Sequence, residues 1–415
     1  MSAVTESERE AATLPLEKFN VADPRLYQED SWRPYFARLR REAPVHYCPE
    51  SAYGPYWSVT KFKDIMTVEV NHEIYSSAGE LGGIQVEDPP KEMSRSSFIR
   101  MDPPKHTQQR RVVAPIVATE NLNNLEPTIR ERTARVLDEL PRGETFDWVD
   151  RVSIELTTMM LATLFDFPFE DRRKLTWWSD VSVANVYATD APVRSEAERF
   201  AELRSMADYM GRLWAERAAA PPKFDLLSML AHGPSTRDMP LLEFIGTLGL
   251  LIVGGNDTTR NTMSGAVLAL QRHSDQWAKL RANRALLPAF VQETIRWQTP
   301  VIHMRRTARV DAELGGQRIR AGDKVVMWYV SGNRDEEVID DPEGFVIDRP
   351  RPRHHLSFGS GIHRCVGDRL AEVQLQVLWD EILQRDLTLE VMGEPVRAYS
   401  NFLRGIKSLP VRISD

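Results

Sequence analysis

The stretch FGSGIHRCVGDRL, residues 358–370, has the residue types and spacing most suited to chemistry. Cys365 is one of only two cysteines in 415 residues, and it lies among Gly359, Gly361 and Gly367. Glycines let a backbone adopt positive φ and approach a flat group closely. Cys365 also directly precedes a helical pattern, and the free N–H groups at a helix start stabilise a thiolate and lower its pKa. The pattern therefore favours a thiolate that binds a metal.

The residues alone leave three interpretations of Cys365 open. A zinc site would use His354, His355 and His363 with Cys365, although zinc ligands usually show tighter paired spacing such as CxxC. A glycine loop with an incidental buried cysteine is the purely structural alternative. The third is an axial thiolate ligand of haem iron, whose electron donation favours cleavage of an O–O bond.

A second pattern, LLIVGGNDTTRN at residues 250–261, places two adjacent glycines inside a helical stretch. Each costs about 1 kcal/mol relative to alanine in a helix interior. Gly254 and Thr258 are four residues apart, so the threonine hydroxyl can bond the Gly254 carbonyl and bend the helix. This would create a groove with a hydroxyl and a neighbouring carboxylate, Asp257. A packed helix whose glycines permit close contact is the alternative.

Glu293 and Arg296 form a third pattern, three residues apart on one predicted helix. Most such pairs are solvated surface pairs that contribute little to stability. The flanking Phe290 and Trp297 favour partial burial instead.

The elements that position these residues are mostly helical. Periodic apolar residues predict helices over 123–140, 150–166, 195–217, 239–271, 286–298 and 366–384. Strands are predicted near 57–62 and between 307 and 330, where Gly-Gly and Ala-Gly-Asp turns separate short apolar runs. Loops are predicted at 76–104, 184–193 and 342–357, and the first is long enough to act as a lid or binding loop.

Composition excludes several classes of protein. A net charge of −7 argues against a nucleic-acid partner. The acidic N-terminus lacks the features of a secretory signal, and the longest apolar run, 244–255, is shorter than the roughly 20 residues that cross a bilayer. We expect a cytoplasmic protein without a membrane span, with Cys48 and Cys365 as reduced thiols.

Taken together, these patterns resemble the cytochrome P-450, or haem-thiolate monooxygenase, superfamily. The cysteine stretch matches its haem-binding loop at Phe358, Gly359, Gly361, His363, Cys365 and Gly367. The resemblance implies a mainly α fold with a small β subdomain, in which haem b is buried between a long central helix and the cysteine loop. It implies one domain over 1–415, with a β-rich part at about 45–75 and 300–330 and a helical part at about 105–298 and 366–384.

The resemblance also implies roles for single residues. Cys365 is the axial ligand of the haem iron, Asp257 gates protons from solvent, and Thr258 supports their delivery to iron-bound oxygen. Glu293 and Arg296 form a structural pair beneath the haem, with a further arginine expected in 333–335 or 350–355. The cations expected at the haem propionates are His106, Arg110, Arg306 and His363.

The chain resembles the bacterial alkane terminal-hydroxylase family within this superfamily, for example in HLSFGSGIHRCVGDRLAE. That family oxidises terminal methyl groups of n-alkanes and fatty acids with O2 and with electrons from NAD(P)H, passed through ferredoxin reductase and ferredoxin. We expect a monomer with an apolar substrate pocket, and nothing in the sequence shows a charged anchor for a carboxylate. Ser360 departs from the family, which commonly has an aromatic residue there. The pocket residues expected from the resemblance are Leu250, Val253, Gly254, Ile302 and Phe402.

Other functions remain as alternatives. A monooxygenase of a terpenoid or steroid would use the same chemistry in a wider pocket, and a peroxygenase would use hydrogen peroxide without ferredoxin. A haem gas sensor or carrier would need the thiolate but neither Asp257 nor Thr258.

Overall fold

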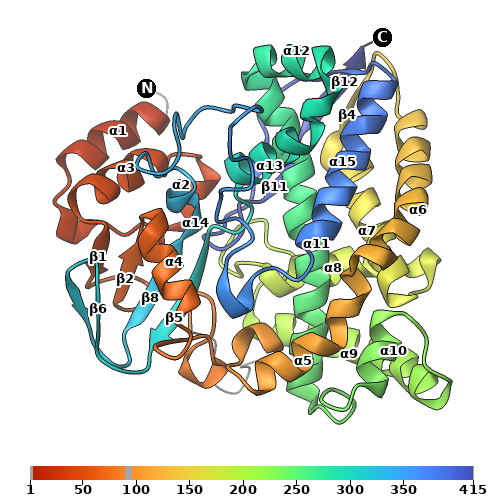
Figure 1. The fold of residues 1–415 in the computed structure, drawn as a ribbon, viewed down its shortest axis with the longest axis horizontal. Coiled ribbons are helices and arrows are strands. Elements are labelled where there is room, and N and C mark those ends of the chain that lie inside the picture. The colour runs from red at the N-terminus through yellow and green to blue at the C-terminus, as the bar shows by residue number, and fades with distance from the viewer. Residues whose placement is uncertain (1–2, 89–95, 415) are drawn as a thin grey trace.

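The computed structural model of the protein describes residues 3–88 and 96–414 and is mainly helical (Figure 1). The helices have the following bounds: α1 Ala3–Thr13, α2 Pro24–Gln28, α3 Arg33–Glu42, α4 Phe62–Val70, α5 Lys105–Val113, α6 Thr119–Asp138, α7 Glu155–Phe165, α8 Arg173–Val183, α9 Glu196–Ala219, α10 Leu226–His232, α11 Leu241–Arg272, α12 Ser274–Ala282, α13 Leu287–Gln298, α14 Tyr329–Gly332 and α15 Asp368–Gln384.

The strands form small sheets. Their bounds are β1 Val45–Cys48, β2 Tyr56–Val59, β3 Tyr75–Ser76, β4 Thr145–Asp147, β5 His303–Ala308, β6 Ala312–Leu314, β7 Gln317–Ile319, β8 Lys324–Trp328, β9 Thr388–Val391, β10 Val396–Arg397, β11 Ile406–Ser408 and β12 Pro410–Ser414. A five-stranded sheet has the order β1-β2-β8-β5-β3, with β2 and β8 parallel and the other neighbours antiparallel. A three-stranded sheet has the order β4-β12-β9, and β6-β7 and β10-β11 are separate pairs.

The predicted fold class, mainly helical with a small sheet, is confirmed. Each of the six predicted helices is present, and the stretch from 241 to 287 forms two helices, α11 and α12, rather than one. The predicted Gly-Gly turn joins β6 to β7, where Gly315 and Gly316 both have positive φ. The C-terminal strands β9 to β12 were not predicted, because runs of two to five residues carry too little periodicity.

Helix α11 lies at the centre of the helical region (Figure 1). It packs against α7, α8, α9, α13 and α15. Between α13 and α15, Phe290 and Trp379 meet edge to face with ring centroids 5.1 Å apart, and neither side chain is more than 1% exposed. Such aromatic pairs contribute about 0.5–1.5 kcal/mol beyond the burial of their area. The central helix is therefore held on several sides.

Two long segments near the cysteine loop have little regular structure. The chain from Asn333 to Ser360 has neither helix nor strand, in agreement with the loop predicted over 342–357. The predicted lid, 76–104, contains short helical turns at Gly79–Leu81 and Phe98–Arg100, whereas residues 89–95 lie outside the described residues.

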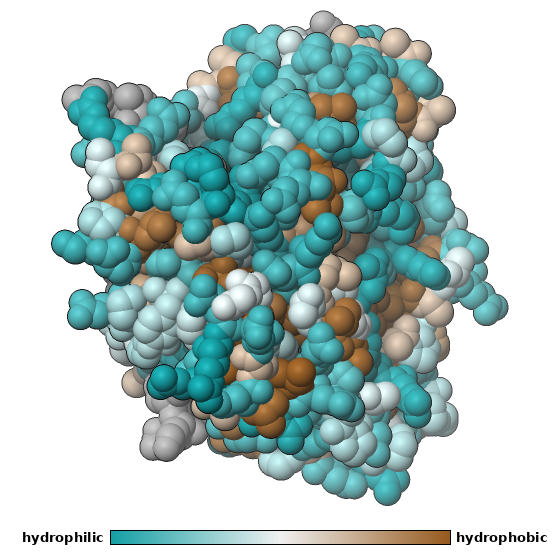
Figure 2. Space-filling model, turned by 60° about the vertical axis from the view of Figure 1, so that its left-hand side comes forward, coloured by the Kyte–Doolittle hydropathy of each residue, from teal (hydrophilic) through white to brown (hydrophobic). Residues whose placement is uncertain are grey.

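The surface is mostly polar. On the face drawn in Figure 2, hydrophobic residues are scattered among hydrophilic ones. Within 3–88 and 96–414, none of the helices combines the length and the apolar character needed to cross a membrane.

Candidate functional site

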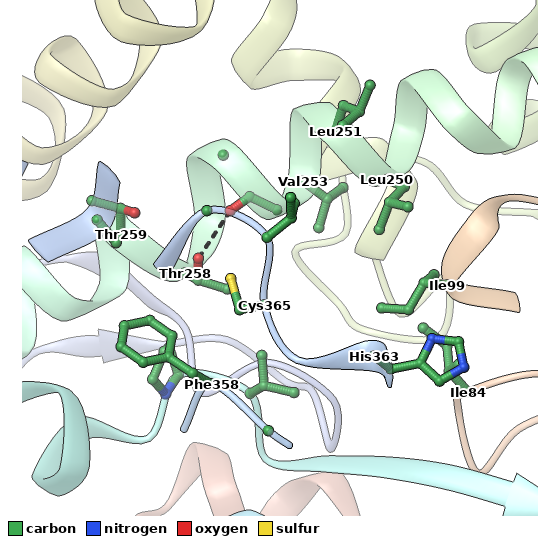
Figure 3. A pocket seen from close by; sticks show the side chains of 18 of the residues that line it. Ile84, Ile99, Leu250, Leu251, Val253, Thr258, Thr259, Phe358, His363 and Cys365 are labelled. Carbon is green, nitrogen blue, oxygen red and sulfur yellow. Dashed lines mark hydrogen bonds between the residues drawn. The ribbon is translucent and has the colours of Figure 1, made fainter. Parts of the chain in front are cut away.

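A cavity of about 310 Å³ lies between α11 and the cysteine loop. Leu250, Val253 and Thr258 project into it from α11, and Cys365 lies on the loop that crosses the same cavity (Figure 3). Gly254 and Phe402 line it as well. The central helix and the cysteine loop, which are far apart in the chain, thus share one cavity, as the resemblance implied.

The cysteine loop depends on its glycines. Gly359 and Gly361 have φ of +63° and +64°, a region that side chains with a Cβ rarely adopt. A Cβ on Gly361 would also lie 2.5 Å from the Glu69 carbonyl oxygen on α4. The N–H of Cys365 donates to the Phe358 carbonyl at 2.8 Å, which closes the loop. The thiol is therefore held at a fixed place beside the start of α15.

Burial dominates the ionisation of the thiol. It raises the pKa of Cys365 to about 11, while the Gly367 backbone N–H lowers it and Asp368 raises it further. The helix start lowers this pKa as expected, through the Gly367 N–H at the N-cap of α15, but burial outweighs it, so the net direction is opposite to the predicted one. The Cys365 side chain is nevertheless open to the cavity, and a coordinating metal deprotonates a thiol outright.

The two glycines of α11 serve different purposes. A Cβ on Gly255 would lie 2.7 Å from Cδ2 of Leu161 on α7, whereas a Cβ on Gly254 would meet nothing within 4 Å. The Thr258 hydroxyl donates to the Gly254 carbonyl at 3.0 Å (Figure 3), and α11 stays helical throughout. Gly255 therefore permits close helix packing, and Gly254 leaves room beside Thr258. The predicted bond from Thr258 to Gly254 is present and Gly255 permits the close packing of the alternative, whereas the bend stays a prediction and the Asp257 carboxylate does not line the cavity.

Asp257 faces away from this cavity. Its side chain is fully buried, accepts a hydrogen bond from the Ser179 hydroxyl at 2.5 Å and pairs with Arg260. Arg260 also pairs with Asp180 at 2.9 Å, and the Asp180 side chain is 38% exposed. Burial raises the pKa of Asp257, and the Arg260 guanidinium opposes that rise. The pair links the centre of α11 to the surface of α8.

Of the four predicted propionate partners, Arg110, Arg306 and His363 line the cavity, and His106 packs against His363 behind it. The rings of His106 and His363 lie 4.4 Å apart, and Ser77 Oγ bonds His363 Nε2 at 2.8 Å. Burial and the cations of Arg110 and Arg306 lower the pKa of His106 to about 4 and that of His363 to about 2. Both imidazoles are therefore neutral at pH 7.

Several polar atoms of these groups have no partner among the described residues. Both ring nitrogens of His106 and Nδ1 of His363 are buried without a hydrogen-bond partner. Neither Arg110 nor Arg306 pairs with a carboxylate among the described residues; they donate to the backbone carbonyls of Arg364 at 2.6 Å and Arg305 at 2.8 Å. Buried donors without acceptors are costly, and two carboxylates bound beside them would satisfy them. The donor set fits haem, whose iron would lie at Cys365.

Glu293 and Arg296 form a buried ion pair, each 2% exposed, with an N–O distance of 2.8 Å. Arg349 also donates to Glu293 at 3.0 Å. The third arginine therefore lies outside both predicted runs, 333–335 and 350–355. Arg334 instead pairs with Glu343 at 3.2 Å. Arg296 further donates to the carbonyls of Asn333, Pro342 and Gly344, which fixes the segment leading to the cysteine loop.

The histidines of the alternative zinc site do not gather around Cys365. His355 Nε2 bonds Gln292 Oε1 at 3.0 Å, and His354 packs on the Phe62 ring with centroids 4.8 Å apart. In the part of the chain that the structure describes, no cluster of histidine, cysteine and acidic residues is suited to hold a metal ion by itself.

Ile302 was predicted to line the pocket, and the structure corrects this. Its side chain is fully buried in the core cluster around Trp328. The neighbouring Val301 and Met304 line the cavity instead. The resemblance gave the right segment, but Ile302 faces the core.

Ser360 has a partner that the sequence did not reveal. Its hydroxyl donates to Glu69 Oε2 at 2.8 Å, and the Tyr329 hydroxyl bonds the same buried carboxylate. Burial raises the pKa of Glu69, and the Arg306 cation opposes the rise. Glu69, Tyr329 and Arg306 all line the cavity. A small hydroxyl residue at position 360 therefore suits this chain because Glu69 lies opposite.

Replacing Ser360 by phenylalanine should lower the free energy of unfolding by about 1–3 kcal/mol, because the ring must displace Glu69 and one donor to a buried carboxylate is lost. Urea unfolding measures the change. Ser360→Ala, which removes only the hydrogen bond, should cost about 1 kcal/mol. A phenylalanine variant as stable as the original protein would contradict the assigned role of Glu69.

Comparison with known proteins agrees with this geometry. A family model described as "Cytochrome P450" matches residues 215–397. The chain is 38% identical over 409 residues to linalool 8-monooxygenase of Pseudomonas putida, covering 95% of this chain and 99% of that protein. It is 30% identical over 405 residues to steroid C26-monooxygenase of Rhodococcus jostii, and the match covers 95% of this chain and 84% of that protein. The solved structure of cytochrome P450-153 from Novosphingobium aromaticivorans superposes on this chain with a TM-score of 0.90, and the two sequences are 48% identical. The superposition covers 95% of this chain and 99% of that one.

Proposed function

The chain belongs to the cytochrome P450 family of monooxygenases, and from that premise we propose that it hydroxylates the terminal methyl group of n-alkanes or fatty acids. The observation that carries this proposal is the apolar lining of the cavity beside Cys365. Leu250 and Val253 on α11, with Ile84 and Ile99 from the segment before α5, offer apolar contacts to an alkyl chain (Figure 3).

The protein's own residues would hold haem b at this place. Cys365 would ligate the iron, and His106, Arg110, Arg306 and His363 would donate to the propionates. The bound haem would supply the activation of O2 and the transfer of one oxygen atom to a C–H bond. The chain's part is to orient the substrate, exclude water and deliver protons.

We propose that protons travel from the surface along α8 to α11. Asp180 is partly exposed, Arg260 pairs with both Asp180 and Asp257, and Thr258 follows Asp257 on the cavity side. A positioned hydroxyl held by the Gly254 carbonyl can pass a proton to an oxygen in the cavity, which is general acid catalysis.

Replacing Thr258 by alanine should lower the yield of product per NADH consumed by about 10- to 100-fold, because general acid catalysis of this kind contributes about that much or more. The missing reducing equivalents should leave as hydrogen peroxide. Thr258→Ser, which keeps the hydroxyl, should retain most of the coupling. Equal coupling in the alanine variant and the original protein would rule out this role.

We propose that NAD(P)H supplies electrons through ferredoxin reductase and ferredoxin. We also propose that the protein is cytoplasmic and works as a monomer. Four cationic side chains are exposed on α5 and around the cysteine loop: Lys105, Arg111, Arg353 and Arg364. Three of them pair with acids, Lys105 with Glu243, Arg353 with Glu372 and Arg364 with Asp368. Complementary charge of this kind mainly raises the rate of encounter with an acidic partner.

Product analysis tests the proposal. Purified protein with ferredoxin, reductase and NADH would be given n-octane, dodecanoic acid and a terpene. Octan-1-ol and the ω-hydroxy acid are the expected products, and oxidation of the terpene alone or subterminal products alone would overturn the proposal. The terpene belongs in the test because relatives of this chain are a linalool and a steroid monooxygenase, which makes a terpenoid or steroid the second candidate.

A further inference from the structure

Arg100 is a cation at the cavity that neither the fold nor the haem requires. It ends the helical turn Phe98–Arg100 and lines the same cavity as Cys365. Its side chain makes one hydrogen bond, from Nη2 to Gln85 Oε1 at 3.0 Å. Gln85 lines the cavity as well, and its amide N–H groups remain able to donate.

No carboxylate of the described residues balances the charge of Arg100. Its neighbour Arg305 pairs with Asp88 at 2.5 Å, and Lys324 shares that carboxylate. Arg100 has no acidic partner within 3–88 and 96–414. Burial and the nearby Arg305 lower the pKa of Arg100 to about 10, so it stays charged at neutral pH. A half-buried cation without a counter-ion is costly, and a bound anion would remove the cost.

The backbone leaves room for this side chain. Gly83 has a φ of +80°, and a Cβ there would lie 3.4 Å from both Cδ and Nη1 of Arg100. The positive φ favours a glycine here, and the Arg100 side chain lies at ordinary van der Waals contact with this position, beside Gln85, which orients it. An arginine held in this way can meet a carboxylate with two parallel hydrogen bonds.

We propose that Arg100, oriented by Gln85, binds the carboxylate of a long-chain fatty acid whose alkyl tail extends past Ile84 and Ile99 toward Cys365. This inference rests on the proposed function and selects the anionic substrate from the two classes given above. It also supplies a charged anchor for a carboxylate, which the sequence did not show.

A haem propionate is the other carboxylate that could reach Arg100. The two propionates would already have at least four donors, from Arg110, Arg306, His106 and His363. Arg100 is therefore left for a different anion. The two possibilities have different consequences: loss of a substrate anchor weakens fatty acids selectively, whereas loss of a propionate partner weakens haem retention and all substrates equally.

Equilibrium binding to the purified, haem-loaded protein distinguishes them. The probes are dodecanoate and its uncharged methyl ester, titrated by the change in the haem absorption spectrum, with Arg100→Gln, Arg100→Lys and the original protein. Arg100→Gln should weaken dodecanoate by about 10- to 100-fold, the range expected for a charge-assisted pair, and change the methyl ester less than about twofold. Arg100→Lys should retain part of the affinity for dodecanoate.

Two controls complete the experiment. Arg309→Gln removes an exposed arginine outside the cavity and should leave both ligands unchanged. The rate of haem transfer to apomyoglobin should be the same in Arg100→Gln and the original protein. Equal weakening of both probes, no weakening of either, or faster haem loss would overturn the inference. Because binding is measured without turnover, none of these results depends on which carbon is oxidised, so failure of the proposed function would be seen separately.

Discussion

Replacing Cys365 by histidine should lower monooxygenase activity by at least about 10³-fold, equivalent to about 4 kcal/mol in activation free energy. Histidine can ligate iron, but it cannot supply the electron donation of a thiolate that favours O–O cleavage. The haem spectrum of the carbon monoxide complex should change to that of a nitrogen-ligated haem, while the propionate partners His106, Arg110, Arg306 and His363 stay in place. Spectra and product formation are measured on the same preparation.

Cys48 provides the matched control for this substitution. It is 2% exposed, lies in the core cluster of the N-terminal helices and donates only to the Glu50 carbonyl. Cys48→Ala should therefore retain the spectrum and the activity. A Cys365 variant with normal activity, or a Cys48 variant with an altered haem spectrum, would show that the thiolate has been assigned to the wrong residue.

The sequence predicted those parts of the site that depend on local patterns. The glycine pattern around Cys365 and the four-residue spacing of Gly254 and Thr258 are legible within a dozen residues, and the structure brings both to one cavity. Helix positions followed from apolar periodicity for the same reason. The pKa of Cys365 was predicted in the wrong direction, because burial depends on the whole fold and outweighs the helix start.

Contacts between distant segments were not predictable in the same way. Ser360 looked anomalous until Glu69, 291 residues away, proved to accept its hydrogen bond. Arg349 was missed because the identity of the third arginine depends on how the irregular segment after α14 folds back to Glu293. Arg100 follows a loop without periodicity, so only the structure reveals that it lines the cavity. Local chemistry was visible in the sequence, and the partners that complete it were not.

The buried network of Glu293 offers the largest expected effect on stability. Glu293→Gln should lower the free energy of unfolding by about 3–5 kcal/mol, the usual cost of removing one partner of a buried ion pair. Arg296 and Arg349 would both keep their charges without the carboxylate, and the amide NH2 of glutamine would replace one of the two oxygens that accept from their guanidinium groups. Urea unfolding followed by tryptophan fluorescence measures the change.

Haem content should fall together with stability in the Glu293 variant, because Arg296 holds the carbonyls of Asn333, Pro342 and Gly344 ahead of the cysteine loop. Asp208→Asn is the matched control, since Asp208 pairs with Arg204 on the surface of α9 with both side chains more than half exposed. Such exposed pairs contribute about 0–1 kcal/mol. A Glu293→Gln variant that lost no more stability than Asp208→Asn would mean that the three backbone hydrogen bonds of Arg296, rather than its charge pairing, hold this segment in place.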